Sequence, residues 1–194
     1  HNIPHKMNNT PQMIWIKRTD SSANWHVFHI GLNDGSAPQD RSLNLNNNQA
    51  FTTNAAFNNY LPNAQQFKVG LLNDTNANNG TFLAVLFGSV TGLSSVGSYD
   101  GNSSNNTITT GFQPRLLLVK KEDGSGSWFL FDTARGWGSG NDKYLQIDET
   151  IAQNGSYNLC NPLSTGFSFS NAATPASGGN LNESGSHYIY YAHA

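Results

Sequence analysis

The chain has few charged residues. Ten Lys and Arg and twelve Asp and Glu make up 11% of its 194 residues and give a formal net charge of −2. Because no basic surplus is available to displace phosphate counterions, the composition argues against a nucleic-acid-binding protein. No apolar run approaches the ~20 residues that a membrane-spanning helix needs, so we predict no membrane insertion.

Cysteine is nearly absent. Cys160 is the single cysteine, so the chain cannot form an internal disulfide, and its stability must come from packing and β-ladders. Cys160 lies in a polar stretch with no histidine close in sequence, which favours a small buried hydrophobe over a catalytic thiol. The sequence has no nucleophile elbow, phosphate loop or zinc-protease motif. We therefore predict a protein that is not an enzyme, with a glycan-degrading activity as the enzymatic alternative.

Small polar residues are abundant instead. Asparagine occurs 27 times, serine 20 times and threonine 14 times, alongside 19 glycines. These residues form helices poorly and are typical of turns. The hydrophobic fraction of 37% still provides enough apolar area for a folded core, which a disordered polar tract lacks. This composition favours a β-rich globular protein.

An internal repeat organises the chain. Five apolar blocks recur in the same order: residues 11–20 with 114–123, 25–28 with 128–131, 40–45 with 142–147, 62–69 with 162–169, and 82–87 with 188–193. The spacing is about a hundred residues, much longer than a solenoid repeat. We predict an all-β fold of two tandem, homologous, antiparallel β-sandwich units of jelly-roll type, at residues 1–92 and 93–194. The alternative is one larger sandwich with two pseudo-symmetric halves.

Each block has the pattern of a β-strand. Residues 13–17 and 116–120 are apolar on both faces, as in a strand buried on both sides. Residues 50–60 are the only candidate for a turn or two of helix. Residues 96–99 and 107–110 predict a hairpin in the second copy. The first copy has only residues 1–6 at the place of its second strand, so we expect its opening strand to precede His1 in a longer polypeptide.

Several of these motifs resemble a β-rich repeat domain of tailed-phage structural proteins, often from marine phages. In the second copy the motifs are residues 97–102, 111–114, 116–121, 128–132, 135–137, 141–145 and 188–192. In the first copy they are His5, Pro11, residues 13–17 and residues 25–29. The first copy departs from the pattern because Asn33-Asp34-Gly35 stands where the second has Arg-Gly-Trp.

The resemblance implies a module of a tail fibre or another virion appendage that attaches to host-surface glycans. It also implies a homo-oligomer, a trimer by analogy, that contacts other virion proteins at the virion surface or in an extracellular setting. The alternative is a purely structural subunit without a ligand, such as a capsid decoration, a fibre-shaft protein or an extracellular filament protein.

Candidate ligand-binding residues follow from the aromatic residues that the repeat does not duplicate. Trp25 and Trp128 recur in both copies and are better explained as core residues. Trp137, by contrast, lies in a glycine-rich loop between Arg135 and Asn141. An exposed indole can stack on a sugar ring while planar polar groups bind its hydroxyls. Trp137, Arg135, Asn141 and Trp15 are therefore the predicted ligand-binding residues.

The histidines and acidic residues do not predict a metal site. His26 and His29 are three residues apart, which places them on opposite faces of a strand. Residues 74–80 have the alternating oxygens of a calcium loop, but they lack its sixth-position glycine and its closing carboxylate. We predict no cofactor and no metal ligand, and calcium at residues 74–80 is the alternative.

Overall fold

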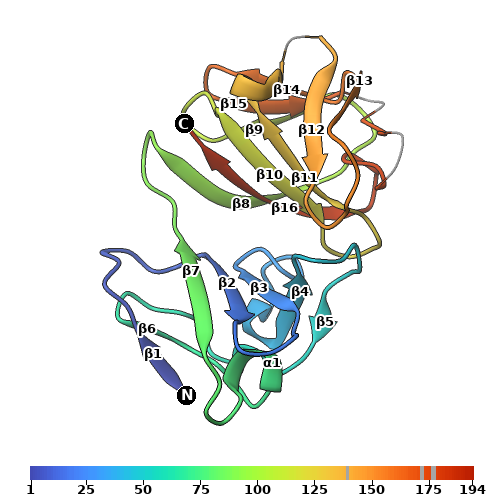
Figure 1. Cartoon of the computed structure of the whole chain (residues 1–194). Helices are drawn as coiled ribbons and strands as arrows, with labels where there is room; N and C mark the ends of the chain where they lie inside the picture. The colour runs from blue at the N-terminus through green and yellow to red at the C-terminus, as the bar shows by residue number, and fades with distance from the viewer. Residues whose placement is uncertain (139, 171–172, 176–177) are drawn as a thin grey trace. The chain divides into compact units, whose positions relative to one another are not determined.

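The computed structural model describes residues 1–138, 140–170, 173–175 and 178–194. The chain forms two compact units (Figure 1). Unit 1 comprises residues 1–46 and 51–88, and unit 2 comprises residues 47–50 and 89–194. The sequence placed the boundary after residue 92, and the structural division falls four residues earlier and assigns the short segment 47–50 to unit 2.

The all-β prediction is confirmed. All strand pairs in the described ranges are antiparallel, and helical structure there is limited to η1 (Pro38–Asp40), α1 (Asn73–Asn76) and η2 (Thr133–Arg135). The expected helical turn within residues 50–60 is wrong, because that segment forms β5 and hydrogen-bonded turns. Among the described residues, no helix is long and apolar enough to span a membrane.

Unit 1 packs a five-stranded sheet against a two-stranded one. Its strands are β1 (Asn2–Pro4), β2 (Met13–Arg18), β3 (Trp25–His29), β4 (Arg41–Asn44), β5 (Thr52–Thr53), β6 (Gln66–Lys68) and β7 (Phe82–Phe87). The larger sheet has the order β5-β4-β3-β2-β7, and β1 pairs with β6. Ile14, Ile16 and Phe28 of the larger sheet pack with Phe67 and with Val69, which follows β6, to form the core of this unit.

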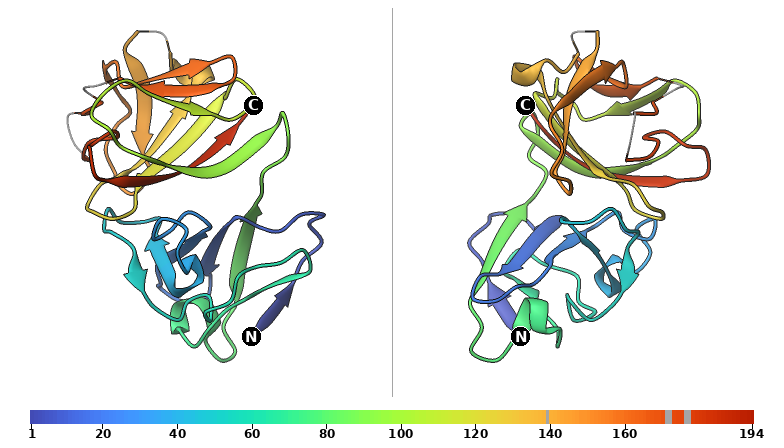
Figure 2. Two further views of the ribbon diagram at one scale, coloured as in Figure 1. Left: turned by 180° about the vertical axis from the view of Figure 1, so that it is seen from behind. Right: turned by 45° about the vertical axis from the view of Figure 1, so that its right-hand side comes forward.

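Unit 2 is a sandwich of a six-stranded and a three-stranded sheet (Figure 2). Its strands are β8 (Ser94–Asp100), β9 (Asn106–Thr109), β10 (Leu116–Lys121), β11 (Trp128–Asp132), β12 (Asp142–Gln146), β13 (Asn154–Tyr157), β14 (Cys160–Leu163), β15 (Gly166–Phe169) and β16 (His187–His193). The sheet orders are β13-β12-β11-β10-β16-β8 and β14-β15-β9. Phe129, Tyr144 and Tyr188 of one sheet pack with Phe167 and Phe169 of the other in an aromatic core.

The strand register of the two units agrees with the sequence repeat. In unit 1, β2 pairs with β3 and β7, and Met13 lies opposite Phe87. In unit 2, β10 pairs with β11 and β16, and Leu116 lies opposite His193. The repeat aligns Met13 with Leu116 and Phe87 with His193, so it aligns residues that also occupy equivalent positions in the two sheets. A register slip of one residue would have moved every side chain to the wrong face.

The two repeated tryptophans share a main-chain arrangement. The amide of Trp25 donates to Asn46 Oδ1, and the amide of Trp128 donates to Asp148 Oδ1, each over 2.9 Å. In both units the residue before the acceptor donates its own amide to the tryptophan carbonyl over 3.0 Å. The side chains differ in exposure, since Trp128 is fully buried and Trp25 is half-buried. The shared hydrogen bonds support a common origin of the two units.

The two units differ at one sheet edge. β1 corresponds to β9, because Ile3 lies opposite Phe67 as Ile108 lies opposite Phe167. In unit 2, β8 pairs along the whole length of β16. β7 corresponds to β16, but it is the terminal strand of its sheet, and no described residue forms a ladder along its outer edge.

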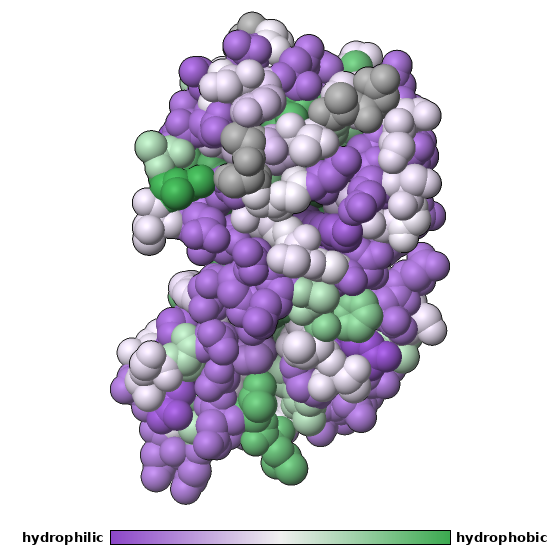
Figure 3. All heavy atoms as spheres, turned by 90° about the vertical axis from the view of Figure 1, so that its right-hand side faces the viewer, coloured by the Kyte–Doolittle hydropathy of each residue, from purple (hydrophilic) through white to green (hydrophobic). Residues whose placement is uncertain are grey.

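The surface is mostly polar on the face shown in Figure 3. Figure 3 shows a face that is mostly hydrophilic, on which hydrophobic residues form separate small groups. Within the part of the chain that the structure describes, the exposed large hydrophobic residues are Leu61, Leu71, Leu83, Val90, Leu93, Ile151 and Tyr157. Single exposed apolar side chains of this kind are common on globular proteins.

Candidate ligand-binding surface

Trp137 lies in the core of unit 2. Only 3% of the residue is exposed, its ring centroid is 5.8 Å from that of Phe131, and its Nε1 donates to the Cys160 carbonyl over 2.7 Å. Gly136 ends η2 with a φ of +107°, a conformation that glycine adopts without strain, and the chain turns there so that Trp137 points inward. The prediction of an exposed indole that contacts a ligand is therefore wrong.

A buried carboxylate holds the same loop from its other end. Asp142 is fully buried, its Oδ1 accepts from the Gly138 amide over 2.9 Å, and its Oδ2 accepts from the amides of Leu159 and Cys160 over 2.6 and 2.9 Å. Asp142 thus links the loop to the start of β14. In the sequence, Asp142 is only an aspartate at the start of a strand with alternating polarity. This pattern does not show whether the aspartate is an exposed turn residue or a buried one.

Arg135 and Asn141 are exposed on either side of this anchored loop. The Arg135 Nε donates to Gln153 Oε1 over 2.9 Å, which links η2 to the segment before β13. The Lys143 amide lies 3.4 Å from the Gly136 carbonyl and brings the two ends of the loop together. The structure therefore places both predicted polar residues at the same edge of unit 2.

An exposed aromatic residue at this edge was missed by the sequence analysis. Tyr157 is 36% exposed and lies opposite Asp142 in the ladder between β12 and β13, next to the position of Asn141. β13 is the terminal strand of its sheet, which leaves the tyrosine ring accessible. We refer to Arg135, Asn141, Gln153 and Tyr157 as the β13-edge surface.

Trp15 belongs to unit 1 and is not part of this surface. It is half-buried in β2, and its ring packs against Phe87 at 4.7 Å between centroids. Its Nε1 is buried and has no hydrogen-bond partner among the described residues. The packing on Phe87 accounts for Trp15 as a structural residue of the sheet.

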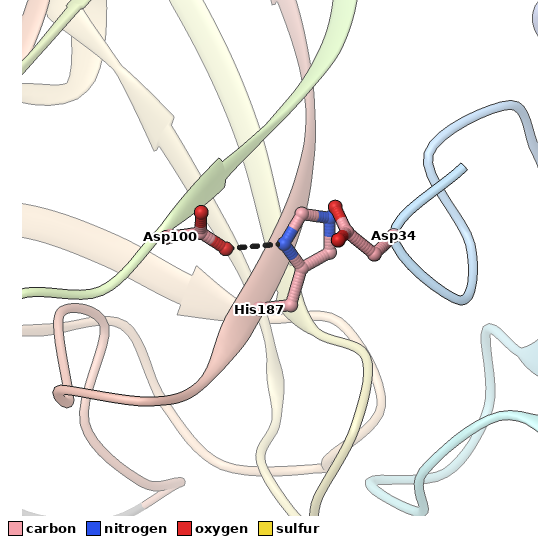
Figure 4. A group of neighbouring side chains, drawn as sticks. All are labelled: Asp34, Asp100 and His187. Carbon is pink, nitrogen blue, oxygen red and sulfur yellow. Dashed lines mark hydrogen bonds and ion pairs between the residues drawn. The ribbon is translucent and has the colours of Figure 1, made fainter. Parts of the chain in front are cut away.

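Cys160 and the histidines have structural environments. Cys160 is fully buried, and burial, together with nearby Asp142, raises the pKa of its thiol well above the usual value. This is the opposite of what a nucleophilic thiolate requires. His187 Nδ1 lies 2.7 Å from Asp100 Oδ1, in a contact between the paired ends of β16 and β8 (Figure 4). Burial lowers the pKa of His26, although Asp74 lies 3.4 Å from its Nε2.

The stretch considered for calcium forms α1 at its start. Asp74 accepts from the Asn24 amide over 3.2 Å, so its carboxylate is directed toward the beginning of β3. Thr75 is buried, and its hydroxyl contacts the carbonyls of Ala56 and Leu72 at 3.3 Å. These contacts direct the two oxygens to different parts of unit 1 and do not form a calcium-loop geometry.

A family model matches residues 1–194 and thus both units; it describes a domain of unknown function, DUF7483. The chain belongs to the DUF7483 family. No curated protein and no solved structure matches it.

The β13-edge surface of the DUF7483 chain combines two kinds of recognition group. Arg135, Asn141 and Gln153 provide planar donors and acceptors, and Tyr157 provides an apolar ring face with a polar hydroxyl. Groups of these two kinds can bind hydroxyl-rich ligands.

Proposed function

We propose that this chain is a non-enzymatic attachment module that binds host-surface glycans through its β13-edge surface. The observation that carries the proposal is the exposure of Tyr157 on β13, the terminal strand of its sheet. The exposed Arg135 and Gln153 are hydrogen-bonded to each other at the segment before this strand, and the exposed Asn141 precedes the partner of Tyr157 in the ladder. An aromatic face packs against the C–H groups of a sugar ring, and planar polar side chains bind its hydroxyls.

The support beneath this surface favours recognition. Asp142 and Trp137 attach residues 137 and 138 to the core, so the neighbouring Arg135 loses little backbone freedom when it binds a ligand. Because the ligand hydrogen bonds involve mostly uncharged groups, binding should depend weakly on salt. A single small surface of this kind gives weak affinity, which several copies in a homo-oligomer would multiply.

The proposed setting is a virion appendage such as a tail fibre. This setting rests on the resemblance of the repeat motifs to tailed-phage structural domains. It implies a location on the virion surface or outside the cell, a trimer by analogy, and contacts with other virion proteins.

Glycan-array and host-cell binding of the isolated chain test this proposal. The variants Tyr157→Ala and Arg135→Ala should each reduce binding at least ten-fold while circular dichroism and thermal unfolding remain unchanged. Gln65→Ala, at an exposed position of unit 1, serves as the matched control and should bind as the native chain does. Unchanged binding by both β13-edge variants would refute the proposed surface.

A purely structural role is the second candidate, and the open edge of β7 favours it. In that case the chain would bind no host glycan and would assemble through strand pairing. Light scattering of a preparation that fails to bind glycans distinguishes this role. Release of reducing ends from host polysaccharide would instead indicate an enzyme.

A further inference from the structure

Unit 1 contains a pocket beside the open edge of its sheet, lined mainly by apolar residues and also by the polar residues His1, Thr75 and Asn76. The pocket has a volume of about 280 Å³. Six apolar residues line it. Ile3 belongs to β1, Ile16 to β2 and Phe67 to β6, Val69 follows β6, and Phe82 and Ala84 belong to β7. For comparison, a cavity of roughly 150 Å³ in another protein holds a benzene molecule. The pocket is therefore large enough for an aromatic side chain.

In unit 2 the equivalent position is filled. The strand registers show which residues of unit 2 correspond to the six that line the pocket. Ile3 corresponds to Ile108, Ile16 to Val119, Phe67 to Phe167, Val69 to Phe169, Phe82 to Tyr188 and Ala84 to Tyr190. The ring of Tyr99 lies among their aromatic members, stacked on Tyr188 at 4.9 Å with an angle of 5° between the planes. Its centroid is also 5.2 Å from that of Phe169 and 6.3 Å from that of Phe167.

Tyr99 reaches this position because β8 pairs with β16. The two strands are paired over seven residues, from His187 opposite Asp100 to His193 opposite Ser94. β7 is the counterpart of β16, and it has no strand on that side among the described residues. Unit 1 thus lacks both parts of the same element, the strand that covers the edge and the aromatic ring that fills the core beneath it.

We propose that the β7 edge and this pocket form a socket for a β-strand that carries an aromatic residue, supplied by a segment that precedes β1 in a longer form of the polypeptide. The strand pairs antiparallel with β7, as β8 pairs with β16, and its aromatic side chain enters the pocket opposite Phe82. An exposed strand edge is a template for such addition, and the pocket adds side-chain specificity. This socket is separate from the β13-edge surface and does not depend on glycan binding.

The source of the strand follows from the order of the repeat. β8 comes directly before β9 in the chain, and β1 is the counterpart of β9. A second copy is a poorer donor, because its β8 is already paired and its Tyr99 is only 8% exposed. Donating that strand would open the core of its own unit 2.

The socket also predicts which residues the donor strand can carry opposite Ala84. In unit 2 a side chain at Gly97 would collide with Tyr190, since a Cβ there would lie 2.6 Å from the tyrosine hydroxyl. Tyr190 is replaced by Ala84 in unit 1. The donor residue opposite Ala84 is therefore not restricted to glycine.

An extended chain tests the proposal. Residues 94–105 are copied ahead of His1, which reproduces the spacing between β8 and β9 because His1 aligns with Asn106. The matched control carries Tyr99→Ser within the copied segment only. Hydrogen exchange along β7 is compared in the native chain, the extended chain and the control.

We expect the outward amides of β7 to exchange at least ten-fold more slowly in the extended chain than in the native chain, and the Tyr99→Ser copy to lose most of this protection. Unchanged exchange in the extended chain would overturn the socket. Equal protection by the control would overturn the role of the pocket. If the native chain already protects β7 by forming a dimer, as measured by light scattering, the assigned source of the strand is wrong.

Discussion

The indole Nε1 of Trp137 donates a 2.7 Å hydrogen bond to the main-chain carbonyl of Cys160. This bond joins the loop after η2 to the first residue of β14, and both residues are buried. A buried carbonyl is costly to leave without a donor, so the indole satisfies a polar group of the core as well as filling space. Trp137 and the glycine before it are thereby held against the sandwich.

Trp137→Phe is expected to destabilise unit 2 by about 1–3 kcal/mol, because the ring is largely kept while the Cys160 carbonyl loses its donor. Trp137→Ala should cost about 3–5 kcal/mol, since it also leaves a cavity. Denaturant unfolding measures both losses. Trp15→Phe is the control: the Trp15 Nε1 has no partner among the described residues, so this change should cost less than Trp137→Phe. Equal losses at the two positions would contradict the role of the hydrogen bond.

Asp142→Ala is expected to destabilise unit 2 by at least about 2 kcal/mol, because two buried amides and one partly buried amide lose their acceptor. Asp142→Asn should also be destabilising, since both carboxylate oxygens accept from amides and an asparagine side chain has one oxygen. The aligned Asp40 provides the control, because no described residue donates to its buried Oδ1. Asp40→Asn should therefore have a small effect in the same unfolding experiment. A harmless Asp142→Asn substitution would contradict this account.

Much of the fold could be predicted from the sequence, because each strand pattern of the repeat occurs in two copies and the two copies support the same assignment. The positions of β2, β3 and β7, and of β10, β11 and β16, follow from blocks whose apolar residues recur in order. Short strands such as β5 and β13 have no comparable pattern. They contain only two and four residues, mostly polar, and such segments are equally typical of loops in a turn-rich chain. The helical turn α1 was missed for the same reason.

The candidate site was only partly predictable. Glycine on both sides of Trp137 suggested an exposed loop, but the direction of the side chain depends on the φ of Gly136 and on a carbonyl acceptor 23 residues away. The burial of Asp142 and the exposure of Tyr157 depend on the pairing of β12 with β13, which is a property of the folded sheet. Arg135 and Asn141 were predictable because polar residues beside a tight turn usually remain at the surface.

Acidification is expected to destabilise unit 1 through His26. Burial lowers the pKa of this histidine below its usual 6.5, with Asp74 opposing the shift. The unfolded chain then binds more protons below about pH 6.5, so stability is complete above that pH and falls as the pH decreases toward the folded-state pKa. Thermal unfolding of the native chain and of His26→Gln between pH 7.5 and 5.5, with hydrogen exchange in β3, measures this loss. The same pH dependence in the variant would exclude His26 as its cause.

Lys120 should make the stability of unit 2 depend on pH in the alkaline range. Its side chain is fully buried in unit 2, where Nζ donates to the carbonyl of Lys121 and lies 3.5 Å from that of Asn48. Burial lowers the pKa of this lysine to about 8, although Asp148 and Asp123 oppose the shift. An unfolded lysine titrates near 10.4, so between pH 8 and 10 the unfolded chain holds more protons and the folded state gains stability as the pH rises.

The expected gain from pH 8 to pH 9.5 is about 1–2 kcal/mol in the free energy of unfolding, from roughly 1.4 kcal/mol per unit of pKa difference. Urea unfolding at several pH values measures it. Measurements stop below pH 10. Burial raises the pKa of Tyr188 to about 12, so above pH 10 an unfolded tyrosine loses its proton before the folded one does, and this opposes the gain in stability. Lys120→Met should remove the dependence and keep the packing, whereas Lys143→Met, at an exposed position, should leave it unchanged. A slope that persists in Lys120→Met would show that another group titrates.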